Sequence, residues 1–498
     1  MLRAASVLKK SMRARISGSP KVIIIGSGIG GLAMGFKLLR AGVRNFEIYE
    51  KSDAVGGTWR DNRYPGVACD IPSHLYTFTF FKNPGWTQLN APGAEIQDYL
   101  QRLARRFGLY RHIRFGKEVV RCGYRDCQWQ IETRDGEANT ADAIVAATGF
   151  LHVPVLPDIA GMDTFAGALM HNSRWDPSVR IDGRRVAVIG TGSSGVQLVP
   201  AIVDRVRSLS IYQRTPQWLF PLPNEQYPLW QRFKRRLFPW IPGRIFDRYL
   251  QEFNTSLGHA VLGDTQKQKF FHDACEQNLA TVRDPELRRK LTPDHPVLCK
   301  RLVFSAKFYE AVQKNHCELV TDPIASIEER GIRSIDGTLR EADVIVVSTG
   351  FKTHEYCRSI GIHGEGGVSL DQAWSDGAVS FESAALAGFP NFFMVGGPHT
   401  TVGNLSYTTC AEMQASYIVQ ALRLRAERGA RGIVPTEQAQ QRFVSDMHAA
   451  SGKTVWKSGC NSWYLDEHGQ LDIWSKSVED FIAMIEKGPQ LPDFRLIR

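Results

Sequence analysis

The chain of 498 residues lacks several features that mark particular classes of protein. No run of about 18 apolar residues occurs, which argues against a membrane-spanning helix. No C-x-x-C pair occurs, which disfavours a zinc ribbon and a dithiol reductase. Cysteine is scarce, and its nine copies are odd in number and scattered, a usage that favours a reducing compartment. We therefore expect a cytoplasmic protein, and no residue pattern predicts a metal site.

Acidic residues are outnumbered, with 51 Asp and Glu against 61 Lys and Arg, so the net charge is +10. This imbalance favours acidic partners such as phosphate-rich cofactors. No recognisable nucleic-acid-reading module accompanies it, so we expect no nucleic-acid partner. Residues 1–20 hold five basic residues and no acid, and we interpret them as a disordered basic tail. A transit peptide or a membrane-surface helix is the alternative.

A dinucleotide-binding unit is predicted at the start of the chain. The apolar, β-branched run at 21–25 is typical of a buried parallel strand, and Gly26 to Gly31 follows it as G-x-G-x-x-G. A helix-like segment and a second strand then lead to Glu50. Glycines let a pyrophosphate approach the backbone, and an acid about 20 residues further on can hold ribose hydroxyls. A Gly-rich turn in an ordinary α/β protein is the alternative. The expected contacts in this motif are Gly26, Gly28, Gly31 and Glu50.

A second unit of the same kind is predicted from residue 185. A buried strand runs into another G-x-G-x-x-G, but the strand after the helix ends in Arg214 where the first unit has an acid. An arginine there fits the 2′-phosphate of NADP, while a solvent-exposed arginine is the alternative reading. The expected contacts are Gly190, Gly192, Ser193, Gly195 and Arg214.

Two nucleotide folds in one chain predict an α/β protein with two Rossmann-like dinucleotide-binding domains. One would hold FAD tightly, and the other would bind a dissociable nicotinamide that supplies hydride. The length allows two or three domains. We predict a basic N-terminal tail at 1–20, the first segment of an FAD-binding domain at 21–150, an NADP-binding domain at 151–349 with a helical insertion at 224–295, and the second segment of the FAD-binding domain with a C-terminal loop at 350–498.

The segment 56–70 is predicted to line the flavin pocket. It has too much Gly and Pro for a helix or a central strand, and too many aromatic and charged residues for an idle loop. It ends in Asp70, and we expect the distant Arg301 to meet that carboxylate. The candidate flavin contacts in and just after it are Gly57, Thr58, Trp59, Asp70 and Tyr76.

Aromatic and basic residues alternate between Trp230 and Trp240 inside the predicted insertion. Such a run is compatible with weak contact to a membrane surface, which would deliver an apolar substrate. The more usual arrangement packs the rings inward and shows the charges to water.

Three motifs together resemble the type I Baeyer–Villiger monooxygenases, a family of class B flavoprotein monooxygenases, from about residue 20 onward. The two glycine motifs are the first. The pattern F-x-G-x-x-x-H-x-x-x-W-[P/D] is the second, and [A/G]-G-x-W-x-x-x-x-[F/Y]-P-[G/M]-x-x-x-D is the third. They are met at Phe165, Gly167, His171, Trp175 and Asp176, and at Gly56, Gly57, Trp59, Tyr64, Pro65, Gly66 and Asp70.

The resemblance implies an activity and roles for individual residues. NADPH would reduce FAD, O2 would add at flavin C4a, and the resulting peroxide would attack a ketone to give an ester or lactone. Arg301 would stabilise the anion and Asp70 would orient Arg301. Lys300, with Arg214 and Thr215, would hold the 2′-phosphate. His171 would couple the position of NADP to domain motion.

The resemblance leaves the substrate open, because residues 456–464 depart from the family pattern in a loop that normally helps to close the active site. We expect an apolar ketone and O2 as small-molecule partners, and a monomer or homodimer. Two alternatives remain. One is an oxygenase acting on sulfur or nitrogen, and the other is a non-catalytic flavin-binding or NADPH-oxidase-like protein.

Overall fold

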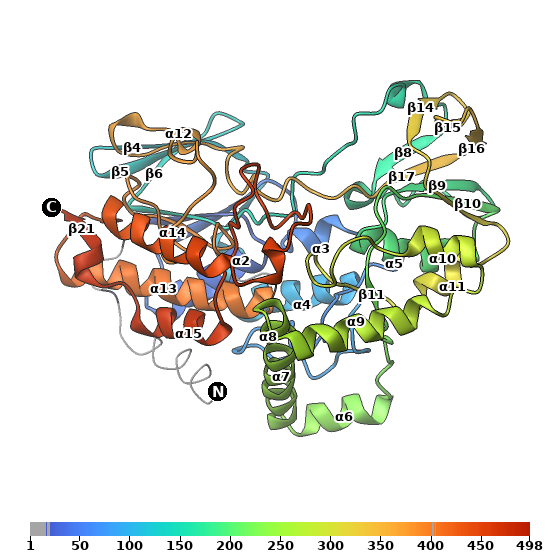
Figure 1. The fold of residues 1–498 in the computed structure, drawn as a ribbon. Helices are drawn as coiled ribbons and strands as arrows, with labels where there is room; N and C mark the ends of the chain where they lie inside the picture. The colour runs from blue at the N-terminus through green and yellow to red at the C-terminus, as the bar shows by residue number, and fades with distance from the viewer. Residues whose placement is uncertain (1–15, 17–19, 401–402, 404) are drawn as a thin grey trace.

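The computed structural model describes residues 16, 20–400, 403 and 405–498. The predicted basic tail at 1–20 lies outside the described residues, apart from Ile16 and Pro20. Figure 1 shows two lobes, each built on a sheet and joined by several crossings of the chain. In the described part of the chain, no helix is long and apolar enough to cross a membrane.

The first lobe is built on a five-stranded parallel sheet in the order β19-β7-β1-β2-β3. Its central strands are fully buried, as the continuous apolar runs in the sequence predict. The chain leaves this sheet after β7 and returns to it at β19, almost 250 residues later. The strands are β1 (Val22–Ile25), β2 (Phe46–Glu50), β3 (Ile113–Phe115), β7 (Ala143–Ala146) and β19 (Phe392–Met394).

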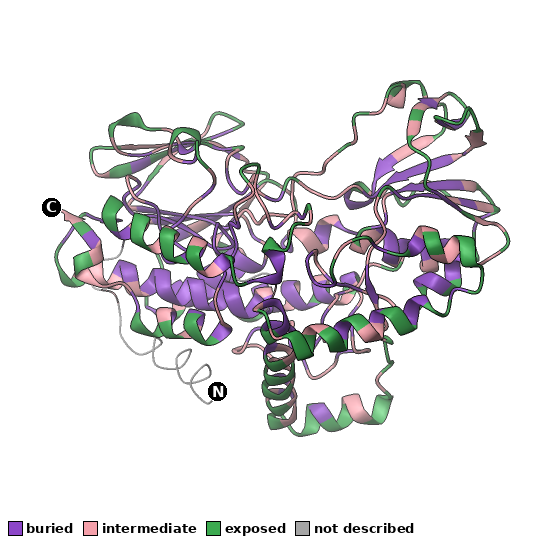
Figure 2. Ribbon diagram, in the orientation of Figure 1, coloured by how far each residue is buried: buried purple, intermediate pink, exposed green. Residues whose placement is uncertain are grey.

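Helices cover this sheet, and α2 and α13 are buried over most of their length (Figure 2). It packs on α2, and between the two helices Lys37 Nζ lies 3.2 Å from the Glu412 carboxylate in the interior. A four-stranded layer, β18-β4-β5-β6, lies beside the sheet. The helices are α2 (Ile29–Arg40), α3 (Thr58–Asp61), α4 (Gly93–Arg106), α13 (Tyr407–Glu427), α14 (Glu437–Ser451) and α15 (Val478–Lys487); the remaining strands are β4 (Val119–Arg125), β5 (Gln128–Thr133), β6 (Ala138–Ala141), β18 (Gly361–His363), β20 (Gly432–Pro435) and β21 (Phe494–Ile497).

The second lobe is built on another five-stranded parallel sheet, in the order β13-β10-β9-β17-β8. A small antiparallel sheet, β14-β15-β16, lies next to it. The elements are β8 (Ala168–His171), β9 (Arg185–Ile189), α5 (Ser193–Ile202), β10 (Ser208–Tyr212), α11 (Phe308–Val312), β13 (Cys317–Val320), β14 (Ile324–Glu328), β15 (Gly331–Ser334), β16 (Leu339–Glu341) and β17 (Val344–Val347).

Between β10 and β13 the chain forms a group of helices, of which α6 and α7 project from the body of the molecule (Figure 1). Helix α7 begins at Trp240 and continues through a π-helical turn at Asn254–Gly258. The elements are β11 (Leu219–Phe220), α6 (Leu229–Leu237), α7 (Trp240–Phe253), α8 (His259–Val261), α9 (Thr265–Leu279), α10 (Pro285–Leu291) and β12 (Val303–Phe304).

Candidate active site

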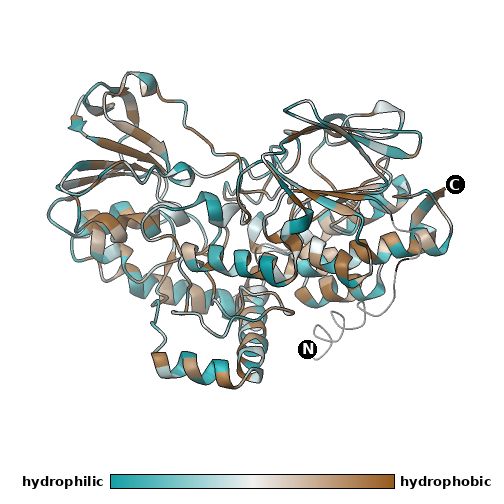
Figure 3. Ribbon diagram, turned by 180° about the vertical axis from the view of Figure 1, so that it is seen from behind, coloured by the Kyte–Doolittle hydropathy of each residue, from teal (hydrophilic) through white to brown (hydrophobic). Residues whose placement is uncertain are grey.

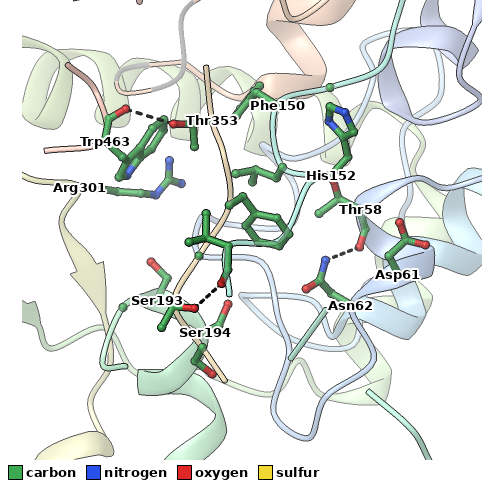
Figure 4. Close-up of a pocket in the computed structure, with 18 of the residues that line it drawn as sticks. Thr58, Asp61, Asn62, Phe150, His152, Ser193, Ser194, Arg301, Thr353 and Trp463 are labelled. Carbon is green, nitrogen blue, oxygen red and sulfur yellow. Dashed lines mark hydrogen bonds between the residues drawn. The ribbon is translucent and has the colours of Figure 1, made fainter. Parts of the chain in front are cut away.

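One cavity of about 1320 Å3 extends between the two lobes. Both glycine motifs, the segment 56–70 and the loop around Arg301 contribute to its wall. Figure 4 shows Arg301 and Trp463 on one side of this cavity, with Thr58 and Asn62 on another. Residues far apart in sequence therefore converge on a single space that is large enough for elongated ligands.

The glycines of each motif divide into two kinds. Gly26, Gly28, Gly190 and Gly192 line the cavity, whereas Gly31 and Gly195 do not. A Cβ on Gly31 would lie 1.8 Å from the Gly26 carbonyl oxygen, and one on Gly195 would lie 2.2 Å from the Gly190 carbonyl oxygen. A Cβ on Gly192 would meet no atom within 4 Å. Gly31 and Gly195 therefore allow close packing of helix and strand, and their contact with the dinucleotide stays a prediction.

Glu50 lies at the end of β2 with its carboxylate buried and held on several sides. The backbone N–H and the hydroxyl of Ser27 donate to it at 2.9 and 2.8 Å, and the Ser52 N–H donates at 3.0 Å. Arg60 Nη1 lies 3.0 Å from its second oxygen. The carboxylate borders the cavity in a fixed orientation, as a ribose-binding acid requires.

The segment 56–70 docks on α5 of the second lobe. A Cβ on Gly66 would lie 2.6 Å from the Gln197 carbonyl oxygen, so the backbones touch there. The Gln197 side chain accepts from the Tyr64 hydroxyl at 2.9 Å and donates to the Ala68 carbonyl at 3.1 Å. Gln197 thus fixes the loop that ends in Asp70. Sequence reasoning missed it, because a glutamine inside a helix carries no local signal.

Arg301 meets Asp70, as the sequence predicted. Its Nη2 and Nε atoms donate to one Asp70 oxygen at 2.6 and 3.2 Å. Both side chains are part-buried in the cavity wall. The Asp70 carboxylate raises the pKa of Arg301 above its usual value, against the opposing effect of burial. The guanidinium is therefore a permanent cation facing the cavity.

Aromatic residues support the part of the cavity wall that the segment 56–70 forms. Trp59 Nε1 donates to the Tyr76 hydroxyl at 3.1 Å, and the two rings meet edge to face at 5.6 Å. Burial raises the pKa of Tyr76 well above its usual value, so the hydroxyl stays protonated. Gly57 and Thr58 border the cavity in the same segment.

Two cations lie together at the second glycine motif. Arg214, Lys300, Ser193 and Thr215 all border the cavity. Burial lowers the pKa of Lys300, and the neighbouring Arg214 charge lowers it further, against the opposing effect of Asp294. Within the described residues, neither cation has a carboxylate within ion-pair distance. A dianionic phosphate is the kind of group that such a pair suits.

His171 is buried at the end of β8 and is absent from the cavity wall. The Ser173 N–H donates to its Nδ1 at 3.2 Å. Its ring meets Phe351 edge to face at 5.6 Å, and Phe351 does border the cavity. Burial lowers the pKa of His171, which favours a neutral ring. Any influence on the cavity therefore passes through neighbouring residues.

A disulfide joins Cys299, directly before Lys300 and Arg301, to Cys460 in the C-terminal loop. Trp463 and Tyr464 of that loop border the cavity, and the Thr353 hydroxyl donates to the Trp463 carbonyl at 3.4 Å (Figure 4). The scattered cysteines gave no sign of this pair, because the two are 161 residues apart. The pair also weakens the cysteine count as an argument for a reducing compartment.

Two parallel sheets, each with a dinucleotide-binding glycine motif, face one cavity whose wall holds a permanent cation. This arrangement is that of an oxidoreductase that uses two dinucleotides. A family model described as flavin-binding monooxygenase-like matches residues 19–280. An uncharacterised monooxygenase of Mycobacterium tuberculosis is 44% identical over 466 residues, which are 94% of this chain and 94% of that protein. A Baeyer–Villiger monooxygenase of Streptomyces coelicolor is 37% identical over 467 residues, 93% of this chain and 90% of that protein.

A crystal structure of OTEMO in complex with FAD and NADP is similar in fold, with a TM-score of 0.86 at 25% identity. The similarity covers 97% of this chain and 100% of that one. The chain belongs to the flavin-binding monooxygenase-like family, and within it to the Baeyer–Villiger monooxygenases.

Proposed function

We propose that this protein inserts one oxygen atom of O2 beside the carbonyl of an apolar ketone to give an ester or a lactone. The enzyme is an NADPH-dependent flavin monooxygenase. In the balanced reaction, the ketone, O2, NADPH and a proton give the ester, water and NADP+. One oxygen atom enters a carbon–carbon bond, the other leaves as water, and NADPH supplies the two electrons.

The observation that carries this proposal is the ion pair between Asp70 and Arg301 in the wall of a cavity shared by both glycine motifs. FAD, when bound and reduced, supplies the activated oxygen. Arg301 keeps its proton at every working pH, so its N–H groups stabilise negative charge on the reacting oxygen atoms. Asp70 orients the guanidinium by accepting two hydrogen bonds from it.

The residues of the cavity fit the two cofactors. Gly26, Gly28 and Glu50, with Gly57, Thr58, Trp59 and Tyr76, would hold FAD. Gly190, Gly192 and Ser193 would bind the pyrophosphate of NADPH. Arg214, Thr215 and Lys300 would bind its 2′-phosphate. The empty space beside Gly192, where a Cβ would meet nothing, supports a ligand that approaches the backbone there.

His171 would act as a positioning residue. It lies on the strand that leads into the second dinucleotide fold, and its ring contacts Phe351 at the cavity wall. We propose that it couples the position of NADP to the motion of one lobe against the other. Its neutral, buried ring gives no support to proton transfer.

The apolar character of the ketone is supported by Phe253, Leu302 and Trp463, which border the cavity. We also propose a cytoplasmic location, which the free cysteines outside the Cys299–Cys460 pair support. The same proposal includes a monomer or homodimer.

NADPH oxidation across a panel of ketones, with products identified by mass, tests this function. We expect ketone-dependent oxidation and a product heavier than the ketone by one oxygen atom. A panel of sulfides and amines should give slower turnover. Oxidation of sulfides but of no ketone would favour the oxygenase acting on sulfur or nitrogen, and peroxide release independent of substrate would contradict both.

A further inference from the structure

Helix α6 turns its apolar face away from the protein. Leu229, Phe233 and Leu237 recur every four residues, which places them on one side of the helix. They are 77%, 63% and 58% exposed, and the adjacent Trp230 is 63% exposed. Surface helices of globular proteins normally bury this stripe. Figure 3 shows the helix at the foot of the molecule, with apolar and polar segments side by side.

The inward side of α6 is held by a basic residue. Arg235 is the buried residue of this helix, and its guanidinium lies 4.0 Å from the centre of the Tyr227 ring. Arg235 Nη2 also donates to Gln231 at 3.1 Å. This stacking on Tyr227 fixes the orientation of the helix with its apolar side outward, so the exposure follows from specific contacts.

The apolar surface continues onto α7 and has a basic border. Phe238 and Trp240 are 45% and 57% exposed, and the Arg244 guanidinium lies 4.8 Å from the centre of the Trp240 ring. Residues 229–248 hold six basic residues and one acid. We call the exposed apolar residues of this region the α6 face; they are Leu229, Trp230, Phe233, Leu237, Phe238 and Trp240.

We propose that the α6 face docks on an anionic lipid surface. Aromatic rings favour the boundary between headgroups and acyl chains, and Lys and Arg at its border pair with lipid phosphates. The charge favours lipid over a second copy of the chain, because a two-fold contact would bring the basic borders of both copies together. Arg236 and Arg248 are exposed at this border, where Arg248 also pairs with Glu252 of the same helix at 3.6 Å.

The docked orientation would bring the cavity close to the lipid. Helix α7 rises from the α6 face, and Phe253 and Leu257 at and beyond its end border the cavity. Its 14 residues span about 21 Å at about 1.5 Å per residue. An apolar ketone dissolved in lipid would therefore be delivered near its site. This consequence rests on the proposed function, whereas the docking itself does not.

Flotation of the FAD-loaded full chain with vesicles tests the docking. The probes are vesicles of phosphatidylcholine with phosphatidylglycerol at about 3:1, and vesicles of phosphatidylcholine alone. We expect binding to the anionic vesicles that weakens with salt, and at least about tenfold weaker binding of a Trp230→Ser/Phe233→Ser variant. The matched control is Phe270→Ser/Ile335→Ser, which replaces two exposed apolar residues elsewhere and should bind within about twofold of wild type.

Three results would overturn the docking proposal. They are no flotation of the wild type, equal loss in the α6 and control variants, and a dimer that depends on Trp230 and Phe233 in the absence of lipid. Turnover of a small water-soluble ketone without vesicles should be the same in all three proteins. Absence of that turnover in the wild type would instead contradict the proposed function, so the two failures are distinguishable.

Discussion

At the scale of single residues, the chemistry depends on which charges the fold stabilises. Arg301 is stabilised as a cation by Asp70 at 2.6 Å. Glu382 shows the opposite case, because burial raises its pKa to about 7, while the hydrogen bond from the Tyr417 hydroxyl opposes that rise. Arg301 therefore stays charged and can stabilise negative charge in the cavity. Glu382 is buried without a cation, so ionising it lowers the stability of the folded protein.

Glu382 predicts a pH-dependent stability. In the unfolded chain it ionises near pH 4.5, but in the folded protein only near pH 7. The stability that the protonated Glu382 carboxyl contributes is therefore fully present below pH 4.5, and it is lost as the pH rises through about 7. Glu382→Gln should therefore raise the free energy of unfolding by about 1–3 kcal/mol at pH 8 and change little at pH 4.5.

Denaturant unfolding at both pH values measures this effect. Glu467→Gln, which removes an exposed carboxylate, is the control and should have no effect at either pH. Equal stability of Glu382→Gln and wild type at pH 8 would show that the Glu382 carboxylate is not held protonated.

At the scale of elements, we propose that each glycine motif has separate glycines for packing and for ligand binding. Gly195→Ala would force a Cβ within 2.2 Å of a backbone carbonyl, so we expect poor folding and a loss of several kcal/mol of stability. Gly192→Ala should leave the free energy of unfolding within about 1 kcal/mol of wild type, because its Cβ enters open space. It should instead weaken NADP+ binding by about tenfold or more, since a methyl group would occupy the approach of the pyrophosphate.

Isothermal titration with NADP+ and thermal unfolding of the two variants separate these effects. If Gly192→Ala destabilised the fold as much as Gly195→Ala, the division between packing and binding glycines would be wrong.

The cross-link between Cys299 and Cys460 predicts a stability that depends on redox conditions. It ties the loop before Arg301 to the C-terminal loop across 161 residues. Cys460→Ser should lower the free energy of unfolding by about 2–4 kcal/mol under oxidising conditions. A reductant should bring the wild type to the level of the variant.

Cys127→Ser is the control, because Cys127 is a partly exposed free thiol. Unfolding midpoints with and without dithiothreitol provide the measurement. Equal unfolding midpoints for Cys460→Ser, Cys127→Ser and the wild type in the absence of reductant would contradict a cross-link in solution.

The sequence predicted those elements and sites that have local signals. Glycine spacing and β-branched runs identified both parallel sheets, and the segment 56–70 was recognised by its composition. The contact of Gln197 with Ala68 and the disulfide both depend on tertiary packing, which leaves no local pattern in the sequence. Helix α14 had no predicted counterpart, because nothing in its composition singled it out.

At the scale of the whole molecule, the two lobes share one cavity and are held together beside it. The segment 56–70 starts in the first lobe and packs on α5 of the second, where Gln197 holds Ala68 two residues before Asp70. Arg301 comes from the second lobe to complete the ion pair. We therefore expect relative motion of the lobes to act directly on the Asp70–Arg301 pair.

The most direct test of this account is the product distribution of Arg301→Ala, with FAD bound. We expect reduction of the flavin by NADPH at the wild-type rate and ester formation lower by about 100-fold or more, with hydrogen peroxide released in its place. Lys314→Ala, which removes a surface cation that pairs with Asp204 in the second lobe, should behave as wild type. A normal ester yield from Arg301→Ala would contradict the central claim.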